Sequence, residues 1–181
     1  MSVQEAAQFY AKNLEDKKFA IEIQRGNAER TMIIRFASEN FRHLMGLHKL
    51  KDIPPLKKRA DIVYHSIFTG EITQQTLDSS GYKDEVVDRW EYYEELLNLL
   101  NTSSLYFKSL QGFFKKIEAE FVIARKIEQT NDKSSFLFFK EDPTNPGLYV
   151  PCSFFIRDGG TKYILPATHW KIISVREITN N

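Results

Sequence analysis

Helical and strand patterns occupy different parts of this 181-residue chain. Before Asn101, apolar side chains mostly recur at helical spacing, whereas after Asn101 short segments have the pattern of strands separated by turn residues. Successive strands joined by short turns are typical of an antiparallel sheet. The order of these patterns predicts an α+β fold, with N-terminal helices and a hairpin packed on a C-terminal twisted antiparallel sheet.

The first expected elements are a helix and a β-hairpin. Residues 2–14 carry apolar side chains near helical spacing, and Ser2 is placed to cap this helix. The alternating segments 19–24 and 31–36 flank the turn signal Arg25-Gly26-Asn27, which predicts a hairpin.

Helices and then strands are expected after the hairpin, all within a single domain that spans residues 1–181. The helix-rich segment 38–101 is expected to be part of that domain, as an insertion or a subdomain. Ser38 is a good cap for the first of these helices. Later helices are expected at about residues 56–68, 73–77 and 84–100, and strands at 105–107, 119–127, 136–140, 149–157, 162–165 and 171–178.

The charge is balanced over the whole chain but not along it. A formal net charge of +1 gives no global positive field of the kind that attracts nucleic acid. Basic residues cluster at 49–59 and 115–126, and acidic residues gather at 84–95. A two-faced molecule and an ordinary solvated surface both remain open.

The sequence excludes several kinds of site. Cys152 is the only cysteine, so the chain forms no internal disulfide and no multi-cysteine zinc site. Metal-binding motifs, phosphate-binding glycine loops and serine-hydrolase motifs are missing, and we expect no metal and no cofactor. The N-terminus has no signal-peptide pattern, and no segment has the roughly 20 apolar residues that would span a bilayer. We therefore expect a cytoplasmic protein without a membrane partner.

Histidines are few, and two of them flank a glycine. On one continuous helix, His43 and His48 would lie about 140° apart, so they would not share a face. In that case His48 joins the apolar stripe as a core residue, which is the interpretation that spacing favours. If Gly46 instead ends the helix, His48 and Lys49 are free to point into a cleft.

RNA cleavage is a chemistry that suits these residue types. RNA carries its own nucleophile, the 2′-OH, so an enzyme needs a base, an acid, and cations or donors for the developing charge. No metal is required for these roles. The chain supplies suitable side chains at Arg42, His43, His48, Lys49, Ser153, Arg157, Lys162 and Thr168.

The string Asn40-Phe41-Arg42-His43-Leu44-Met45-Gly46-Leu47-His48-Lys49-Leu50, preceded by a hairpin, resembles a known family pattern. The family is a phage-encoded subgroup of the nuclease superfamily that unites barnase, EndoU, colicins E5 and D, and RelE. Residues 68–73 and 151–154 are also similar to it, so the resemblance covers most of the chain.

The resemblance implies a metal-independent ribonuclease, with N-terminal helices packed on a four- or five-stranded antiparallel sheet. His43, His48 and Lys49 match the helix motif and are the implied catalytic residues, with Ser153 and then Thr168 as sheet hydroxyls. The near-neutral charge suggests that a partner presents the RNA, for which the guide RNA of a CRISPR effector is one example, giving an anti-CRISPR role. The expected RNA-binding residues are Arg42, Arg125, Lys126, Arg157, Lys162 and His169.

Two other functions remain open from the sequence. The chain could be a non-catalytic binding protein that has kept a nuclease-like fold and inhibits a nucleoprotein by occupying it. It could also be an interaction module whose acidic segment 84–95 docks a basic partner. The sequence does not indicate an oligomeric state.

Overall fold

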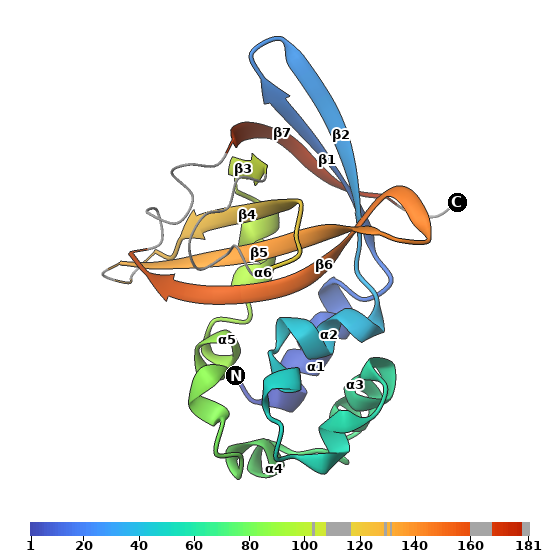
Figure 1. Cartoon of the computed structure of the whole chain (residues 1–181), viewed down its shortest axis with the longest axis vertical. Helices are drawn as coiled ribbons and strands as arrows, with labels where there is room; N and C mark the ends of the chain where they lie inside the picture. Colours follow the sequence, from blue (N-terminus) through green and yellow to red (C-terminus); the bar gives the residue numbers. More distant parts are fainter. Residues whose placement is uncertain (103, 108–116, 129, 131, 160–167, 179–181) are drawn as a thin grey trace.

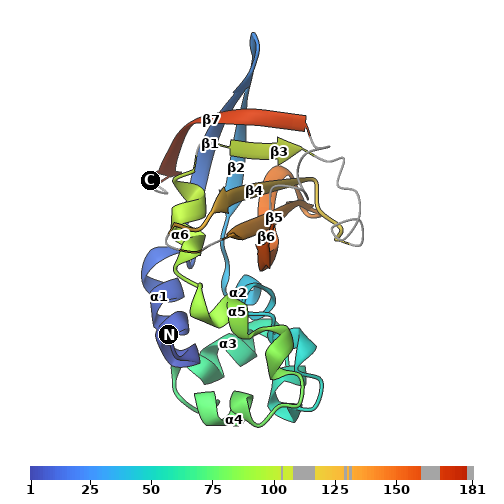
Figure 2. The ribbon, with the colours of Figure 1, turned by 90° about the vertical axis from the view of Figure 1, so that its left-hand side faces the viewer.

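The computed structural model describes residues 1–102, 104–107, 117–128, 130, 132–159 and 168–178. Within these residues, helices α1–α5 gather at one end of a curled sheet, and the tip of the β1–β2 hairpin projects away from them (Figures 1 and 2). Helices come first in the chain and most strands come last, which confirms the predicted α+β class.

The bounds of the elements follow the chain. The α-helices are α1 (Val3–Asn13), α2 (Ser38–Leu44), α3 (Ala60–Phe68), α4 (Gln74–Asp78), α5 (Val87–Glu91) and α6 (Glu95–Leu100), and the short 3-10 helices are η1 (Leu47–Lys49), η2 (Pro54–Lys57) and η3 (Lys83–Glu85). The strands are β1 (Lys18–Arg25), β2 (Ala28–Arg35), β3 (Ser104–Phe107), β4 (Phe121–Lys126), β5 (Lys133–Asp142), β6 (Asn145–Asp158) and β7 (Thr168–Ile178).

Local signals fix the N-terminal elements. The Ser2 side chain accepts a hydrogen bond from Glu5 N, and the Glu5 carboxylate accepts one from Ser2 N, so the predicted capping box of α1 is present. The predicted hairpin is also confirmed. At α2 the cap prediction was wrong, because Ser38 is already helical. Asn40 Oδ1 instead accepts from the Ala37 amide at 2.8 Å.

The described strands form one sheet that closes on itself in the order β1-β2-β6-β5-β4-β3-β7. The hairpin is therefore part of the sheet rather than a layer packed on it. Strand pairing is antiparallel except between β2 and β6, which pair in parallel through Ile33–Leu148 and Ile34–Tyr149. The expected strand 162–165 lies outside the described residues.

The expected continuous helix over 84–100 was wrong. This segment folds as η3, α5 and α6, and the chain leaves helical geometry at Val86 and again near Tyr92. The β-branched pair Val86-Val87 and the aromatic residues that follow have weak helix propensity. Trp90 and Tyr93 are both buried, and the Trp90 side chain of α5 contacts the end of α2.

One buried cluster joins the helices to the sheet. It contains Tyr10 from α1, Phe41 from α2, Tyr93 and Phe154, whose rings meet edge to face along this path. A smaller cluster around Phe138 and other sheet residues lies apart from it. Whether residues 38–101 form an insertion or subdomain stays a prediction. In the described part of the chain, no helix has the length and apolar character needed to cross a membrane.

Candidate active site

Gly46 ends α2 and reverses the path of the chain. Its φ of 73° lies in the left-handed region that glycine adopts without steric cost. A side chain would not fit there either, since a Cβ atom would lie 2.7 Å from Val86 Cγ1 and 3.1 Å from the Arg89 side chain. The next residues form η1, so Gly46 ends the helix as in the second of the two interpretations of this segment. His48 is exposed but lines neither of the two cavities described below.

This turn brings the two histidines together. The ring centroids of His43 and His48 lie 4.7 Å apart with an interplanar angle of 39°. Both imidazoles are solvent-exposed, and Lys49 beside them is half-buried. A continuous helix would have separated the rings, so their pairing depends on Gly46.

Two side chains of helix α5 hold this turn in place by hydrogen bonds. The Arg89 Nη1 donates to the His43 carbonyl at 3.1 Å, and the Trp90 Nε1 donates to the Met45 carbonyl at 3.0 Å. Carbonyls in the last turn of a helix lack their usual intrahelical partners. Trp90 supplies one to Met45, whereas the His43 carbonyl accepts from both Arg89 and the Gly46 amide, the latter at 3.1 Å. The position of the imidazole pair is therefore set by a helix 40 or more residues further along the chain.

Three cations surround one aromatic ring of β6. The guanidinium carbon of Arg89 lies 4.2 Å from the Phe155 centroid, that of Arg157 lies 5.6 Å away, and Lys49 Nζ lies 5.8 Å away. Because alternate residues of a strand share a face, Ser153 lies on the same face of β6 as Phe155 and Arg157. The imidazole pair and this cationic cluster thus meet between α2–η1 and β6.

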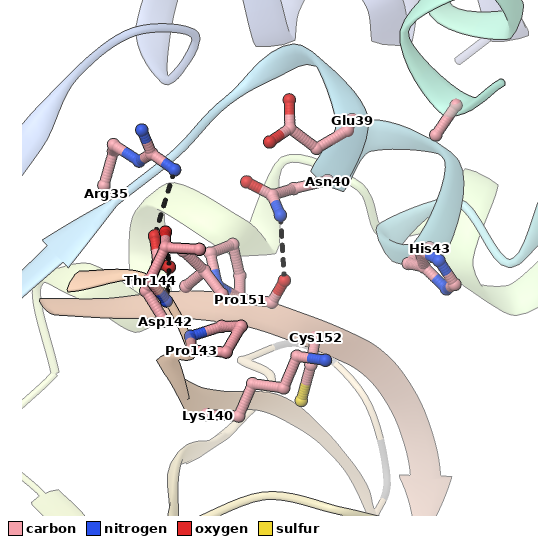
Figure 3. Close-up of a pocket in the computed structure, with 12 residues that line it drawn as sticks. Arg35, Glu39, Asn40, His43, Lys140, Asp142, Pro143, Thr144, Pro151 and Cys152 are labelled. Carbon is pink, nitrogen blue, oxygen red and sulfur yellow. Dashed lines mark hydrogen bonds and ion pairs between the residues drawn. The ribbon is translucent and has the colours of Figure 1, made fainter. Parts of the chain in front are cut away.

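Two cavities lie along β6, near α2 and η1. The larger, of about 380 Å³, is lined by His43, Lys140 and Cys152 among others (Figure 3). The smaller, of about 240 Å³, is lined by residues of η1, η3, α5 and β6, including Lys49 and Arg89. Residues 150–152 of β6 line the first cavity and residues 155–157 line the second. Ser153 lies between these two stretches of the strand.

The surroundings of the site shift the pKa values of its titratable side chains. Desolvation by the surrounding protein, then His43 and the nearby cations, lower the pKa of His48 to about 4. The pKa of His43 is lowered too, chiefly by desolvation and then by Arg42. Burial raises the pKa of the Cys152 thiol to about 11, so this cysteine stays protonated and is a poor nucleophile.

The sequence of the chain as a whole carries a family signature. Residues 2–174 match the profile of the family described as phage-Barnase-EndoU-ColicinE5/D-RelE like nuclease4. The chain belongs to this nuclease-like family. The predicted resemblance is thereby confirmed, and the match includes the imidazole pair and β6. No curated protein and no solved structure matches the chain.

The fold of this nuclease-like protein separates the predicted site residues into groups. His43, His48, Lys49, Ser153 and Arg157 lie at the site described above. Arg42 is next to it on α2, where its Nη1 donates to the Lys58 carbonyl at 3.4 Å and its charge lowers the pKa of both histidines.

The remaining predicted residues of this family member lie elsewhere. Arg125 and Lys126 are on β4, where Arg125 pairs with Glu128 at 3.1 Å and with Glu95 at 3.8 Å. Thr168 and His169 are on β7, which pairs with β1 and β3 and does not adjoin β6. The structure does not bring these four to the imidazole pair, and Lys162 lies outside the described residues.

Sequence reasoning missed Arg89. The signal was present, because Arg89 follows Val86 by three residues and precedes Tyr93 by four, which places a charged residue on the apolar stripe. Lys140 of β5, which lines the larger cavity, was also missed. Among the described residues, no group of three His, Cys, Asp or Glu side chains is arranged to hold a metal ion.

Proposed function

We propose that the protein is a metal-independent RNA endonuclease. The observation that carries this proposal is the pair of exposed imidazoles, 4.7 Å apart, at the edge of a cluster of cations. Two imidazoles can supply a base and an acid, and the cations can stabilise negative charge on phosphorus. Membership of a nuclease-like family supports the same reaction class.

The proposed reaction uses the 2′-OH of RNA as the nucleophile. His48 is the base, because its low pKa keeps the imidazole neutral and able to accept the 2′-OH proton. The 2′ oxygen attacks the adjacent phosphorus, and the bond from phosphorus to the 5′ oxygen breaks. His43, which must be in its protonated imidazolium form for this step, donates a proton to that leaving oxygen and becomes neutral. The products are a 2′,3′-cyclic phosphate and a 5′-OH.

Lys49 and Ser153 have supporting roles in this proposal. Lys49 follows His48 directly and brings a positive charge to the phosphate as negative charge develops. Ser153 is a buried residue of β6 between the stretches that line the two cavities, and its hydroxyl is the proposed donor of a hydrogen bond to a phosphate oxygen. Thr168 is left out because β7 does not adjoin β6.

We further propose that the RNA is a host or defence RNA held by a partner protein, consistent with a phage or mobile-element origin. The net charge of +1 supports this, since long-range attraction of free RNA is weak for a nearly neutral protein. A CRISPR guide RNA bound to its effector is the example to test, and cleavage of it would make the protein an anti-CRISPR enzyme.

The test is cleavage in the presence of EDTA. Purified protein is incubated with an RNA pool and with a guide RNA, free or bound to its effector. We expect discrete fragments ending in 2′,3′-cyclic phosphate, and no cleavage of a substrate with a 2′-deoxy residue at the cleaved position. His48→Ala and His43→Ala should each reduce the rate by about 10²–10⁴-fold. His65→Ala, at an exposed histidine of α3, is the matched control and should cleave normally.

Other results would redirect the proposal. Fragments that disappear with EDTA would contradict the metal-independent mechanism. Intact RNA in every reaction, with folded protein, would favour the alternative of a binding protein that inhibits a nucleoprotein partner. Binding that is lost on reversing charges in the acidic segment 84–95 would favour the interaction module instead.

A further inference from the structure

The smaller cavity beside the imidazole pair has a buried positive charge in its wall. Arg89 lines it and retains only 2% of its surface exposed. The Arg89 Nη1 is hydrogen-bonded to the His43 carbonyl, but its Nη2 is buried with no hydrogen-bond partner. Burying a guanidinium with an unsatisfied donor is costly unless something compensates the charge.

No carboxylate in the described part of the chain forms an ion pair with Arg89. The salt bridges nearby use other cations: Glu85 pairs with Lys49 at 3.7 Å, and Asp88 pairs with Lys133 at 3.4 Å. The Phe155 ring covers the guanidinium at 4.2 Å, which stabilises a cation but does not neutralise it.

The carboxylates at this cavity lie at its rim. Asp84, Glu85 and Asp88 also line the cavity, but Asp84 and Glu85 are exposed and Asp88 is partly exposed. Water and salt screen exposed charges strongly, whereas a buried charge such as Arg89 is screened much less. The interior of the cavity therefore favours an anion. Such an anion would also use Lys49, which in this structure pairs with Glu85.

We propose that this cavity binds one phosphate group of the nucleic acid strand, held by Arg89 Nη2, Lys49 and Arg157, and that Glu85 competes with it for Lys49. This proposal rests on the proposed function, because it assigns the cavity to a phosphate of the same substrate. The site lies next to the imidazole pair, so a phosphate held there positions the strand beside His43 and His48.

The first experiment measures binding of inorganic phosphate by calorimetry at fixed ionic strength in chloride. We expect one site per chain. Arg89→Met keeps an apolar stem under Phe155 and should weaken binding at least tenfold. Glu85→Gln should strengthen binding about three- to tenfold, since it removes the competing carboxylate. Glu91→Gln, at an exposed carboxylate of α5 that does not line the cavity, is the matched control and should bind as the wild type does.

Glu85→Gln keeps the test decisive if Arg89→Met fails to fold. Equal phosphate affinity in Glu85→Gln and Glu91→Gln, or in wild type and a folded Arg89→Met, would overturn the proposal. Undetectable binding by both wild type and Glu85→Gln would overturn it as well.

A second experiment separates a strand phosphate from free phosphate. A dinucleotide with a 2′-O-methyl group cannot be cleaved and carries one internucleotide phosphate. If Arg89→Met weakens its binding as it weakens phosphate binding, the strand phosphate is supported. An unchanged dinucleotide affinity would restrict the cavity to free phosphate and sink the proposal. Neither experiment needs cleavage, so the two proposals fail separately. A protein that binds phosphate through Arg89 but does not cleave RNA would refute only the endonuclease proposal. A protein that cleaves RNA but binds phosphate without Arg89 would refute only the phosphate site proposed here.

Discussion

At the scale of single residues, partial burial and neighbouring charges change the chemistry of common side chains. His48 lies beside His43, Arg89 and Lys49, so its protonated form is disfavoured and its pKa falls to about 4. Burial and Arg157 lower the pKa of Arg89 to about 9. The same surroundings that disfavour a further proton favour an anion. A phosphate would therefore relieve the repulsion that these residues exert on one another.

This reasoning predicts how the histidines titrate. In phosphate-free buffer, NMR should give a pKa near 4 for His48 and a value below 6.5 for His43. Saturating phosphate should raise both, because an anion stabilises each imidazolium. An unfolded histidine binds its proton near pH 6.5, above the pKa values of the folded pair. The contribution of the pair to the free energy of unfolding should therefore be complete above pH 6.5 and should be lost as the pH falls towards 4. Histidine pKa values for the pair that do not respond to phosphate would contradict the prediction.

At the scale of elements, the geometry of the site depends on where helix α2 ends. The α2 helix ends at Leu44, Gly46 turns the chain, and α5 donates two side-chain hydrogen bonds to the carbonyls of His43 and Met45. Neither element alone places the imidazoles. The pairing of His43 with His48 therefore depends on a close approach between the glycine and Val86.

Gly46→Ala tests this dependence. The left-handed φ and the 2.7 Å approach to Val86 Cγ1 should together reduce the free energy of unfolding by about 2–4 kcal/mol. Gly26→Ala is the matched control, because Gly26 has a φ of 59° but no atom lies within 4 Å of the point that a Cβ would occupy. It should lose only the backbone part, about 1–2 kcal/mol. Urea denaturation measures both, and equal losses would show that the close packing at Gly46 contributes nothing.

Elements with local signals were predictable from the sequence, whereas those set by distant contacts were not. Ser2 and Glu5 cap α1 through bonds within one turn, and the hairpin around Gly26 also follows from local pattern. The helix expected over 84–100 is broken at Val86 and near Tyr92, and its aromatic residues pack in the core with residues from other elements. In the site, the motif around Gly46 contains both histidines of the imidazole pair, but their contact needed the turn that spacing alone disfavoured.

At the scale of the whole molecule, the candidate site holds only a small share of the 25 lysine and arginine residues. The net charge is +1, and the cations at the candidate site converge on one face of β6. Arg125 lies on β4, where carboxylates pair with it, and β7 with His169 does not adjoin β6. A strand of RNA bound at the site would therefore meet a small number of cations.

The salt dependence of RNA binding tests this arrangement. For a single strand, each phosphate neutralised contributes about −0.7 to the slope of log K against log salt concentration. Contacts to Lys49, Arg89 and Arg157 predict a slope of about −2. The measurement uses a 2′-O-methyl RNA, which cannot be cleaved, titrated by fluorescence anisotropy over a range of potassium chloride concentrations. Lys49→Gln should make the slope shallower by about 0.7, and Lys126→Gln, on exposed β4 surface, should leave it unchanged.

Either extreme of the slope would contradict the local site. A slope steeper than about −5 would require many more phosphate contacts than the three cations around Phe155 provide. The basic residues of β4 would then have to belong to the binding surface, as the sequence first suggested. A slope near zero would mean that no phosphate is neutralised, and a nearly neutral protein that binds RNA in that way would have to recognise bases or a partner protein instead. The local site predicts a slope near −2 that changes with Lys49→Gln but not with Lys126→Gln. That result would support binding of a short strand at a small cationic cavity.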